Sequence, residues 1–454
     1  MTVGSRARNE AHARRFTDPD REHVDRRGVG RHGHAAVLTL TCSACGSAAA
    51  DLDAIVCAAC GDLLAFVLDT AAVDRSIVER TSRARRASSE PRDRSGVWRF
   101  RELLPFVADD AITTLREGDV PLYDAPRGAA YAGVERLAYL HLGMNPTASF
   151  KDAGMTVAVS RARARGARIA VCASTGNTAA SMAAYAARAG MTAVVIAPVD
   201  GISAAKVAQT LDYGAHVVAV DGDFDDALRA VRALDPATVA VVNSVNPFRI
   251  EGQKTAAFVL LEQRDWKAPD WVVLPGGNLG NSSALGKGFR EARAIGLSQA
   301  EPRLAVVQAA GAAPFARAWR DEAELIPVRA QTDATAIKIG APASWKKARA
   351  EVRASNGTVL SVEDPEIAEA RAVIGRDGVG CEPASAASLA GLRRLVDDGT
   401  IARDADIVCV LTGHVLKDTA YASRYHESGA TYANAIVRGT QVADYLAALL
   451  AERA

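Results

Sequence analysis

Short apolar runs alternate with alanine-rich stretches beyond residue 167 of this chain. Seven runs follow one another: RIAVCAS, TAVVIAP, HVVAV, TVAVVN, WVVLP, RLAVVQ and DIVCVLT. Each has the length of a strand, is rich in β-branched residues, and precedes a stretch that could form a helix. Because nearly every position in these runs is apolar, the strands are expected to be buried on both faces. The pattern predicts an α/β protein with parallel sheets between layers of helices.

The N-terminal part lacks this alternation and divides into three segments. Residues 1–37 are rich in Arg, acids and His without apolar periodicity, which predicts a disordered tail. Residues 38–67 form a compact cysteine unit, and the Arg- and Ser-rich residues 68–94 are expected to be an exposed linker. The main body is expected to span residues 95–454, with a smaller mobile domain at about 155–245.

Composition makes a small molecule the expected partner. The chain has 54 basic and 53 acidic side chains, so its total charge favours neither nucleic acid nor an anionic membrane. Residues 1–37 could instead be an arm that binds nucleic acid, but their acidic residues dilute the positive charge and no aromatic stacking platform accompanies them. A misassigned start codon would also explain this segment. No apolar run approaches the roughly 20 residues of a membrane span, and no secretory signal is visible, so a soluble cytoplasmic protein is expected.

Four of the seven cysteines lie in two CxxCG turns, Cys42-Ser-Ala-Cys45-Gly and Cys57-Ala-Ala-Cys60-Gly. This is the spacing of a four-cysteine zinc ribbon, in which each turn directs two thiolates to one ion. No further ligand nearby suggests an open coordination position, so the expected role of the zinc is structural. Four free thiols in a metal-free knuckle are the alternative. The remaining cysteines lie singly in apolar segments, which fits a reducing compartment.

Lysine is rare in this chain, which makes a lysine within a motif informative. Only nine of the 54 basic residues are lysines. A desolvated lysine can form a Schiff base or lose its proton near neutrality, which arginine cannot do. Lys151 lies in Asn145-Pro-Thr-Ala-Ser-Phe-Lys151-Asp152, where it could begin a helix. An ordinary lysine at a helix N-terminus is the alternative for this motif taken alone.

Two turns between a predicted strand and a predicted helix are suited to anions. They are Ser174-Thr-Gly-Asn177-Thr178 and Pro275-Gly-Gly277-Asn278-Leu279-Gly280-Asn281. Unpaired N–H groups and the positive end of the helix dipole favour a phosphate or carboxylate there, and glycine allows its close approach. The second turn is neither a Walker A loop nor a GxGxxG fingerprint. Together with Lys151, the turns indicate a phosphorylated cofactor and an acidic substrate.

Seven motifs in order carry a resemblance to a known family. They are Glu117-Gly-Asp-Val-Pro-Leu122, NPTASFKD, ASTGNT, Asn243-Ser-Val-Asn-Pro-Phe-Arg249-Ile-Glu-Gly-Gln-Lys254, PGGNLGNSSA, Glu382-Pro-Ala-Ser385-Ala-Ala-Ser and Leu411-Thr412-Gly-His-Val-Leu-Lys417-Asp418. Together they resemble threonine synthase, and the cysteine unit resembles one that some members carry. The resemblance implies fold type II (tryptophan synthase β-like), with pyridoxal phosphate between two doubly wound parallel-sheet domains, and a homodimer.

The resemblance also implies which residues bind the cofactor. Lys151 would hold pyridoxal phosphate as a Schiff base and then move protons at the substrate Cα and Cβ. Asn177 would bind the ring 3-oxygen, and Thr412 the ring nitrogen. The cofactor phosphate would be bound by the turn that contains Gly277, Asn278, Leu279, Gly280 and Asn281.

By the same resemblance the chain is a carbon–oxygen lyase of threonine biosynthesis. Its substrate would be O-phospho-L-homoserine, whose phosphate leaves from Cγ before water adds at Cβ to give L-threonine. The substrate phosphate would be bound by Ser174, Asn243, Ser244, Arg249 and Asn278. Thr175 and Thr178 would hold the α-carboxylate, and Thr178 would also orient the attacking water.

The chain departs from the family at several positions, and other functions are possible. Ala148 and Val415 stand where members usually have Gly, Val120 where they have Thr, and Ala153 where they often have Arg. The second hypothesis is a β-replacement lyase acting on O-phosphoserine, like cysteate synthase. The third is a zinc-ribbon binding protein with an inactive body, against which the intact Lys151 argues.

Overall fold

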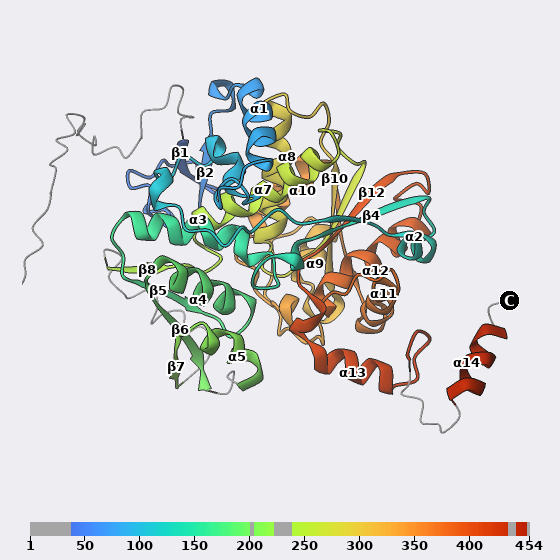
Figure 1. Cartoon of the computed structure of the whole chain (residues 1–454). Helices are drawn as coiled ribbons and strands as arrows, with labels where there is room; N and C mark the ends of the chain where they lie inside the picture. The colour runs from blue at the N-terminus through green and yellow to red at the C-terminus, as the bar shows by residue number, and fades with distance from the viewer. Residues whose placement is uncertain (1–37, 200–203, 222–237, 435–441, 452–454) are drawn as a thin grey trace, which may run out of the picture.

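The computed structural model describes residues 38–199, 204–221, 238–434 and 442–451, so the expected tail at 1–37 lies outside the described residues. Strands β1 (Leu38–Cys42) and β2 (Leu64–Leu68) form an antiparallel ribbon. Two further sheets have the strand orders β11-β10-β9-β12-β4-β3 and β7-β6-β5-β8 (Figure 1). Within the described ranges, none of the helices has both the length and the apolar character needed to cross a membrane.

The larger sheet is parallel except at one edge. It contains β3 (Leu122–Asp124), β4 (Arg136–His141), β9 (Trp271–Pro275), β10 (Arg303–Ala309), β11 (Thr358–Val362) and β12 (Asp406–Leu411), and only β3 runs antiparallel to its neighbour. Alternate residues of β9 enter different cores: Trp271 and Val273 join one, and Val272 and Leu274 join the other. All of β9 is therefore buried, as expected for a strand covered on both faces.

Helices form the two layers over this sheet. One core includes residues of α2 (Pro126–Ala132), α11 (Asp364–Arg376) and α12 (Pro383–Asp397), and the other includes residues of α7 (Pro247–Gln263), α8 (Gly280–Ala294) and α10 (Trp345–Ala354). The sheet is thus wound on both sides, which confirms the predicted fold class for the larger domain.

The smaller sheet is wholly parallel. It contains β5 (Ile169–Ala173), β6 (Thr192–Pro198), β7 (His216–Val220) and β8 (Val239–Val241). Helices α3 (Lys151–Ala164) and α4 (Asn177–Ala189) share a buried core with β5 and β6, and α5 (Ala204–Asp212) follows β6. The seven apolar runs correspond to β5 through β10 and β12, so the parallel α/β prediction is confirmed.

Two helices approach each other through glycine. A Cβ on Gly252 of α7 would lie 1.9 Å from the carbonyl oxygen of Ala153 in α3. A Cβ on Gly154 of α3 would lie 2.7 Å from the carbonyl oxygen of Arg249 in α7. Because real Cβ atoms do not approach this closely, glycine is what lets the two backbones touch. The contact fixes the start of α3, at Lys151, relative to Arg249.

The cysteine ribbon packs on α3 and α8. Lys287 Nζ of α8 donates to the carbonyl oxygen of Phe66 in β2, at 2.7 Å. Arg161 of α3 binds Asp53 of the ribbon through Nε at 2.9 Å and Nη2 at 2.7 Å. Such a two-point contact between a guanidinium and a carboxylate holds orientation as well as distance. The ribbon is therefore attached to the helices that begin at Lys151 and at the 277–281 turn.

Residues 68–94 differ from the expected exposed linker because they contain helix α1 (Arg75–Arg86). Asp74 caps this helix by accepting a hydrogen bond from the Ser76 N–H at 2.8 Å. Val78 is 1% exposed and packs in the core with α7 and α8. Most of the charged residues that suggested a linker lie on the solvent-exposed face of α1. Composition alone therefore did not reveal that Val78 attaches this helix to the core.

The glycine contact predicts the effect of substituting Gly252. Gly252→Ala should lower the free energy of unfolding by about 1–3 kcal/mol, because the added methyl group forces the α3 and α7 backbones apart. Chemical denaturation, with the midpoint as readout, measures the change.

Gly375→Ala is the matched control, since a Cβ at this α11 position meets no atom within 4 Å. It should leave stability unchanged or raise it by up to about 1 kcal/mol. A Gly252→Ala variant as stable as this control would contradict the close contact.

Candidate active site

One cavity contains many of the side chains that the sequence singled out. Among the predicted site residues its lining includes Lys151, Ser244, Arg249, Gly277, Asn278, Leu279, Gly280, Asn281 and Thr412. These residues come from the start of α3, from α7 and the segment before it, from the turn after β9, and from the end of β12. Long-range folding thus brings four separate motifs to one place.

Lys151 is the first residue of α3 and is partly buried. Its Nζ lies 3.5 Å from the centroid of the Phe150 ring. Burial lowers the pKa of Lys151 to about 7; the nearby positive charge of Arg249 lowers it further, and Glu382 opposes both effects. Near neutral pH a large fraction of this amine is therefore unprotonated and able to act as a nucleophile.

The loop before Lys151 is held by the turn that follows β12. The Phe150 N–H donates to the Thr412 carbonyl at 2.9 Å, and the His414 N–H donates to the Ala148 carbonyl at 3.1 Å. Ala148 has φ of +64°, a left-handed conformation that costs a residue with a Cβ roughly 1–2 kcal/mol. The conformation explains physically why glycine suits this position, and the chain carries the strain of Ala148 beside its motif lysine.

Asp152 fixes the same loop from inside. Its carboxylate accepts hydrogen bonds from Thr147 N at 2.7 Å, Thr147 Oγ1 at 2.6 Å and Ser181 Oγ of α4 at 2.6 Å. Burial raises the pKa of Asp152 to about 6, although these hydrogen bonds oppose the shift. The sequence analysis quoted Asp152 within the motif but gave it no role. The structure shows that it joins the Lys151 loop to α4.

The turn from Gly277 to Asn281 follows β9 and begins α8. Leu279 has φ of +64° and is the residue immediately before the helix. Asn281 is 7% exposed, and its Nδ2 has no hydrogen-bond partner among the described residues. A buried amide donor at a helix N-terminus is suited to an anion, so this turn fits a phosphate group.

Glu382 links residues of the two domains. Asn177 Nδ2, at the start of α4, donates to Glu382 Oε2 at 3.0 Å, and Thr412 Oγ1 donates to Glu382 Oε1 at 3.4 Å. Glu382 is 4% exposed, and burial raises the pKa of its carboxyl, whereas the Asn177 hydrogen bond and the charge of Lys151 act in the opposite direction. Glu382 also lines the cavity. Sequence reasoning assigned it no role, although its acidic side chain in that motif was a signal.

Arg249 is a buried cation that pairs with no carboxylate among the described residues. It is 1% exposed; Nη1 donates to the Val242 carbonyl at 3.2 Å, and Nε and Nη2 have no partner within the described ranges. Burial lowers the pKa of Arg249 to about 10, so it remains charged at neutral pH. Leaving such donors unpaired is costly, and a bound anion would satisfy them. Asn278 and Ser244, which are hydrogen-bonded to each other, line the same cavity.

The turn between β5 and α4 lies outside the lining of this cavity. Ser174, Thr175, Asn177 and Thr178 belong to it, and only Asn177 reaches a cavity residue, through its hydrogen bond to Glu382. Asn243 is also absent from the lining. Its amide donates to and accepts from the Ala173 backbone, both at 3.1 Å, and so fixes the end of β5.

The four cysteines of the ribbon converge. Their Sγ atoms all lie within 4.8 Å of one another. The Cys42–Cys60, Cys45–Cys60 and Cys45–Cys57 distances are 3.4, 3.5 and 3.7 Å. A tetrahedral zinc with Zn–S bonds of about 2.3 Å places its ligands about 3.8 Å apart. The arrangement is therefore suited to one tetrahedral ion.

Comparison with known proteins agrees with this geometry. A family model described as pyridoxal-phosphate dependent enzyme matches residues 113–413. Threonine synthase of Methanocaldococcus jannaschii is 42% identical over 391 residues, covering 85% of this chain and 94% of that protein. Threonine synthase of Methanosarcina acetivorans is 47% identical over 326 residues, which cover 71% of this chain and 80% of that protein. The structure of the processed form of threonine deaminase isoform 2 from Solanum lycopersicum matches with a TM-score of 0.59 at 19% identity. The match covers 72% of this chain and 94% of that chain and shows a shared fold.

The lowered pKa of Lys151 predicts a pH profile for its reactivity. Acylation of Lys151 by an amine-reactive reagent, followed by peptide mass spectrometry, should reach half its maximal rate near pH 7, because only the unprotonated amine reacts. A lysine peptide labelled in the same tube should follow an ordinary pKa of about 10.4. Lys151 labelling that still rises with the peptide above pH 9 would contradict the desolvated amine.

Proposed function

Because this chain belongs to the threonine synthase family of pyridoxal-phosphate-dependent enzymes, we propose that it converts O-phospho-L-homoserine and water to L-threonine and phosphate. The observation that carries the proposal is Arg249. Its buried guanidinium has two nitrogens without a partner among the described residues, and it lines the same cavity as Lys151 and the 277–281 turn. A site with two separate places for phosphate suits a phosphorylated cofactor and a phosphorylated substrate.

The cavity residues fit pyridoxal phosphate. Lys151 would hold it covalently, the turn from Gly277 to Asn281 would bind its phosphate, and Asn177 and Thr412 would contact its ring oxygen and nitrogen. The unpaired Asn281 amide and the nucleophilic pKa of Lys151 support this assignment. When bound, pyridoxal phosphate supplies an electron sink that stabilises negative charge developing at the substrate carbons.

Lys151 is the proposed general base and acid. Its pKa of about 7 allows it both to accept and to donate a proton near neutral pH, as proton transfer at Cα and Cβ requires. Arg249 remains charged under the same conditions and would bind the leaving phosphate. Burial thus gives the two cations different tasks: one gives up its proton, and the other keeps it.

We propose that the remaining substrate contacts come from the smaller domain. Ser174, Thr175 and Thr178 would reach the substrate if the domain at about 155–245 closed toward the cavity, with Thr178 orienting the attacking water. Ser244 and Asn278 would bind the substrate phosphate beside Arg249. Asn243, whose amide is engaged with Ala173, would assist by fixing the strand end from which the turn at 174–178 starts.

Three further assignments belong to the same proposal. The ribbon would hold one structural zinc, supported by the converging Sγ atoms of its four cysteines. The enzyme would act in the cytoplasm, where the free cysteines would stay reduced. It would also form a homodimer, as the family resemblance implies.

Replacing Arg249 by methionine tests the proposal. Charge-assisted hydrogen bonds are worth about 1.5–3 kcal/mol each, so Arg249→Met should lower kcat/KM for O-phospho-L-homoserine at least roughly tenfold. The free energy of unfolding should not fall, because the variant removes a buried cation that has no carboxylate partner.

Two further readouts make the Arg249 test specific. Arg249→Lys should recover only part of the activity, because a point charge cannot reproduce the planar donor fork. The visible absorbance of the bound cofactor and its affinity should stay near wild type in both variants. Loss of cofactor, or normal turnover of O-phospho-L-homoserine, would show that Arg249 does not bind the substrate phosphate.

The zinc assignment predicts a separable effect. Replacing Cys42 and Cys45 together by Ser should release about one zinc per chain and lower the thermal midpoint, while much of the activity remains. Elemental analysis of purified wild type and variant measures the metal. Unchanged zinc content in the variant, or none in the wild type, would contradict a ribbon zinc.

A further inference from the structure

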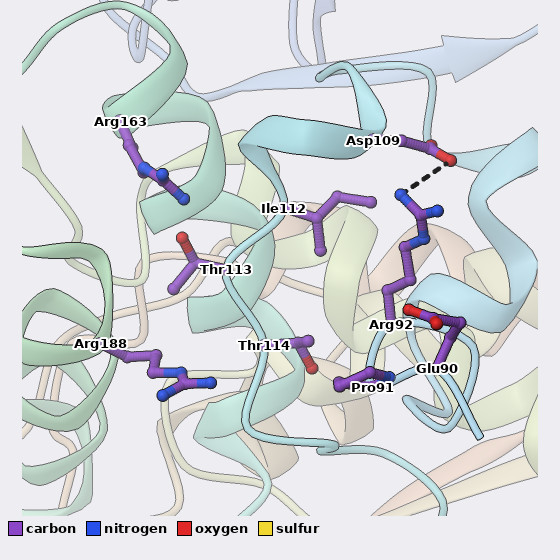
Figure 2. A pocket seen from close by; sticks show the side chains of 9 residues that line it. All are labelled: Glu90, Pro91, Arg92, Asp109, Ile112, Thr113, Thr114, Arg163 and Arg188. Carbon is purple, nitrogen blue, oxygen red and sulfur yellow. Dashed lines mark ion pairs between the residues drawn. The ribbon is translucent and has the colours of Figure 1, made fainter. Parts of the chain in front are cut away.

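A second cavity of about 420 Å³ lies at the ends of α3 and α4 opposite to Lys151 and Asn177 (Figure 2). Its walls come from these two helix ends and from the segments near residues 90 and 110. No residue of this cavity belongs to the site described above. Its volume is within the range of small-molecule sites.

Two arginines form a cationic wall. Arg163 near the end of α3 and Arg188 near the end of α4 both extend toward the cavity in Figure 2. Both arginines are exposed, and within the described part of the chain neither guanidinium forms a hydrogen bond or an ion pair. Interaction with the negative end of the helix dipole explains a basic residue at each position. It does not explain why the two side chains converge on one cavity.

Thr113 adds a buried and unpaired hydroxyl. The residue is 3% exposed, and its Oγ1 has no hydrogen-bond partner in the described structure. Its backbone is fixed, since Thr113 N donates to Ser160 Oγ at 2.8 Å and its carbonyl accepts from Thr156 Oγ1 at 2.6 Å. An unsatisfied buried hydroxyl costs about 1–3 kcal/mol. Its oxygen points toward the Arg163 side of the cavity in Figure 2, where a ligand could satisfy it.

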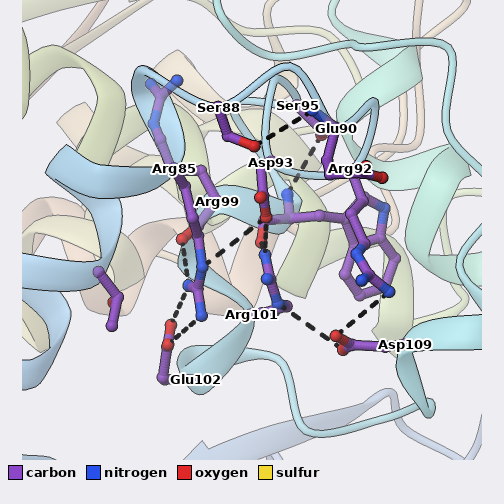
Figure 3. A network of polar contacts seen from close by, with 12 residues as sticks. Arg85, Ser88, Glu90, Arg92, Asp93, Ser95, Arg99, Arg101, Glu102 and Asp109 are labelled. Atoms are coloured by element: carbon purple, nitrogen blue, oxygen red, sulfur yellow. Dashed lines mark hydrogen bonds and ion pairs between the residues drawn. The ribbon is translucent and has the colours of Figure 1, made fainter.

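The opposite wall carries Glu90 and Asp109 together with Arg92. Asp109 is already paired with Arg92 at 3.4 Å and with Arg101 at 3.7 Å, as part of the polar network in Figure 3. The Glu90 side chain is exposed and has no partner within the described residues. Among the described residues, the unpaired charges around the cavity are thus the guanidinium groups of Arg163 and Arg188 and the carboxylate of Glu90.

We propose that this cavity binds an acidic amino acid. Two carboxylates would meet Arg163 and Arg188, the ammonium would meet Glu90, and Thr113 would complete the hydrogen bonding. A ligand with two negative groups and one positive group matches the unpaired charges of the walls. The proposed site is independent of the reaction proposed for the Lys151 cavity.

A simple anion fits this cavity less well. Inorganic phosphate or a dicarboxylate could pair with the arginines, but it would leave the Glu90 carboxylate without a cationic partner. The ammonium group is therefore the feature on which selectivity should depend.

Calorimetric titration of the cofactor-loaded enzyme with L-glutamate, glutarate and inorganic phosphate tests the proposal. L-Glutamate should bind saturably, and glutarate, which lacks only the ammonium group, should bind at least tenfold more weakly. The Arg163→Gln/Arg188→Gln double variant should weaken L-glutamate binding at least tenfold. Arg168→Gln, at an exposed arginine outside the cavity, is the matched control and should bind as wild type does.

Two measurements separate this site from the active site and from a general anion site. The visible absorbance of the bound cofactor should not change during the titration. Glu90→Gln should bring the affinities of L-glutamate and glutarate together. The proposal is overturned if L-glutamate does not bind saturably, or if glutarate or phosphate binds to the wild-type enzyme equally well. It is also overturned if Arg168→Gln weakens L-glutamate binding as much as the double variant does. A change in the cofactor absorbance on L-glutamate binding would likewise contradict it.

Discussion

The contact between the backbones of α3 and α7 is the constraint on which the site depends. Gly252 and Gly154 allow the two helices to touch, and a Cβ on Gly252 would meet the Ala153 carbonyl at 1.9 Å. Lys151 begins one helix, and Arg249 lies in the first turn of the other. Because both helices are almost fully buried, neither can move aside without disturbing a core. Close backbone packing at two glycines therefore sets the distance between Lys151 and Arg249.

Burial at that contact determines the charges of the site. It lowers the pKa of Lys151 to about 7 and that of Arg249 to about 10, so the lysine is partly neutral and the arginine is charged at the same pH. Glu382 limits the shift of Lys151 and also accepts hydrogen bonds from Asn177 and Thr412. One region of low polarity thus yields a base, a fixed cation and a buried acid that joins two domains.

Sequence patterns predicted most of the architecture because burial on both faces leaves a continuous apolar run. They did not reveal β4, which begins with the exposed Arg136, or the short strands β3 and β11, whose residues are only partly apolar. Motifs identified Lys151 and Arg249 as candidates. They could not show that Glu382 contacts Asn177, 205 positions away, because such a contact is created by packing. The hydrogen bonds between the Asn243 amide and the Ala173 backbone could not be predicted from the sequence for the same reason.

The central claim is that the Lys151 cavity accepts a substrate phosphate beside Arg249 and directs the reaction to threonine. The most direct measurement supplies the cofactor-loaded enzyme separately with O-phospho-L-homoserine and with O-phospho-L-serine plus sulfite, and identifies the amino acid formed by mass spectrometry. The account predicts L-threonine and phosphate in equal amounts from the first and little turnover of the second. Efficient conversion of O-phospho-L-serine without threonine formation from O-phospho-L-homoserine would contradict it.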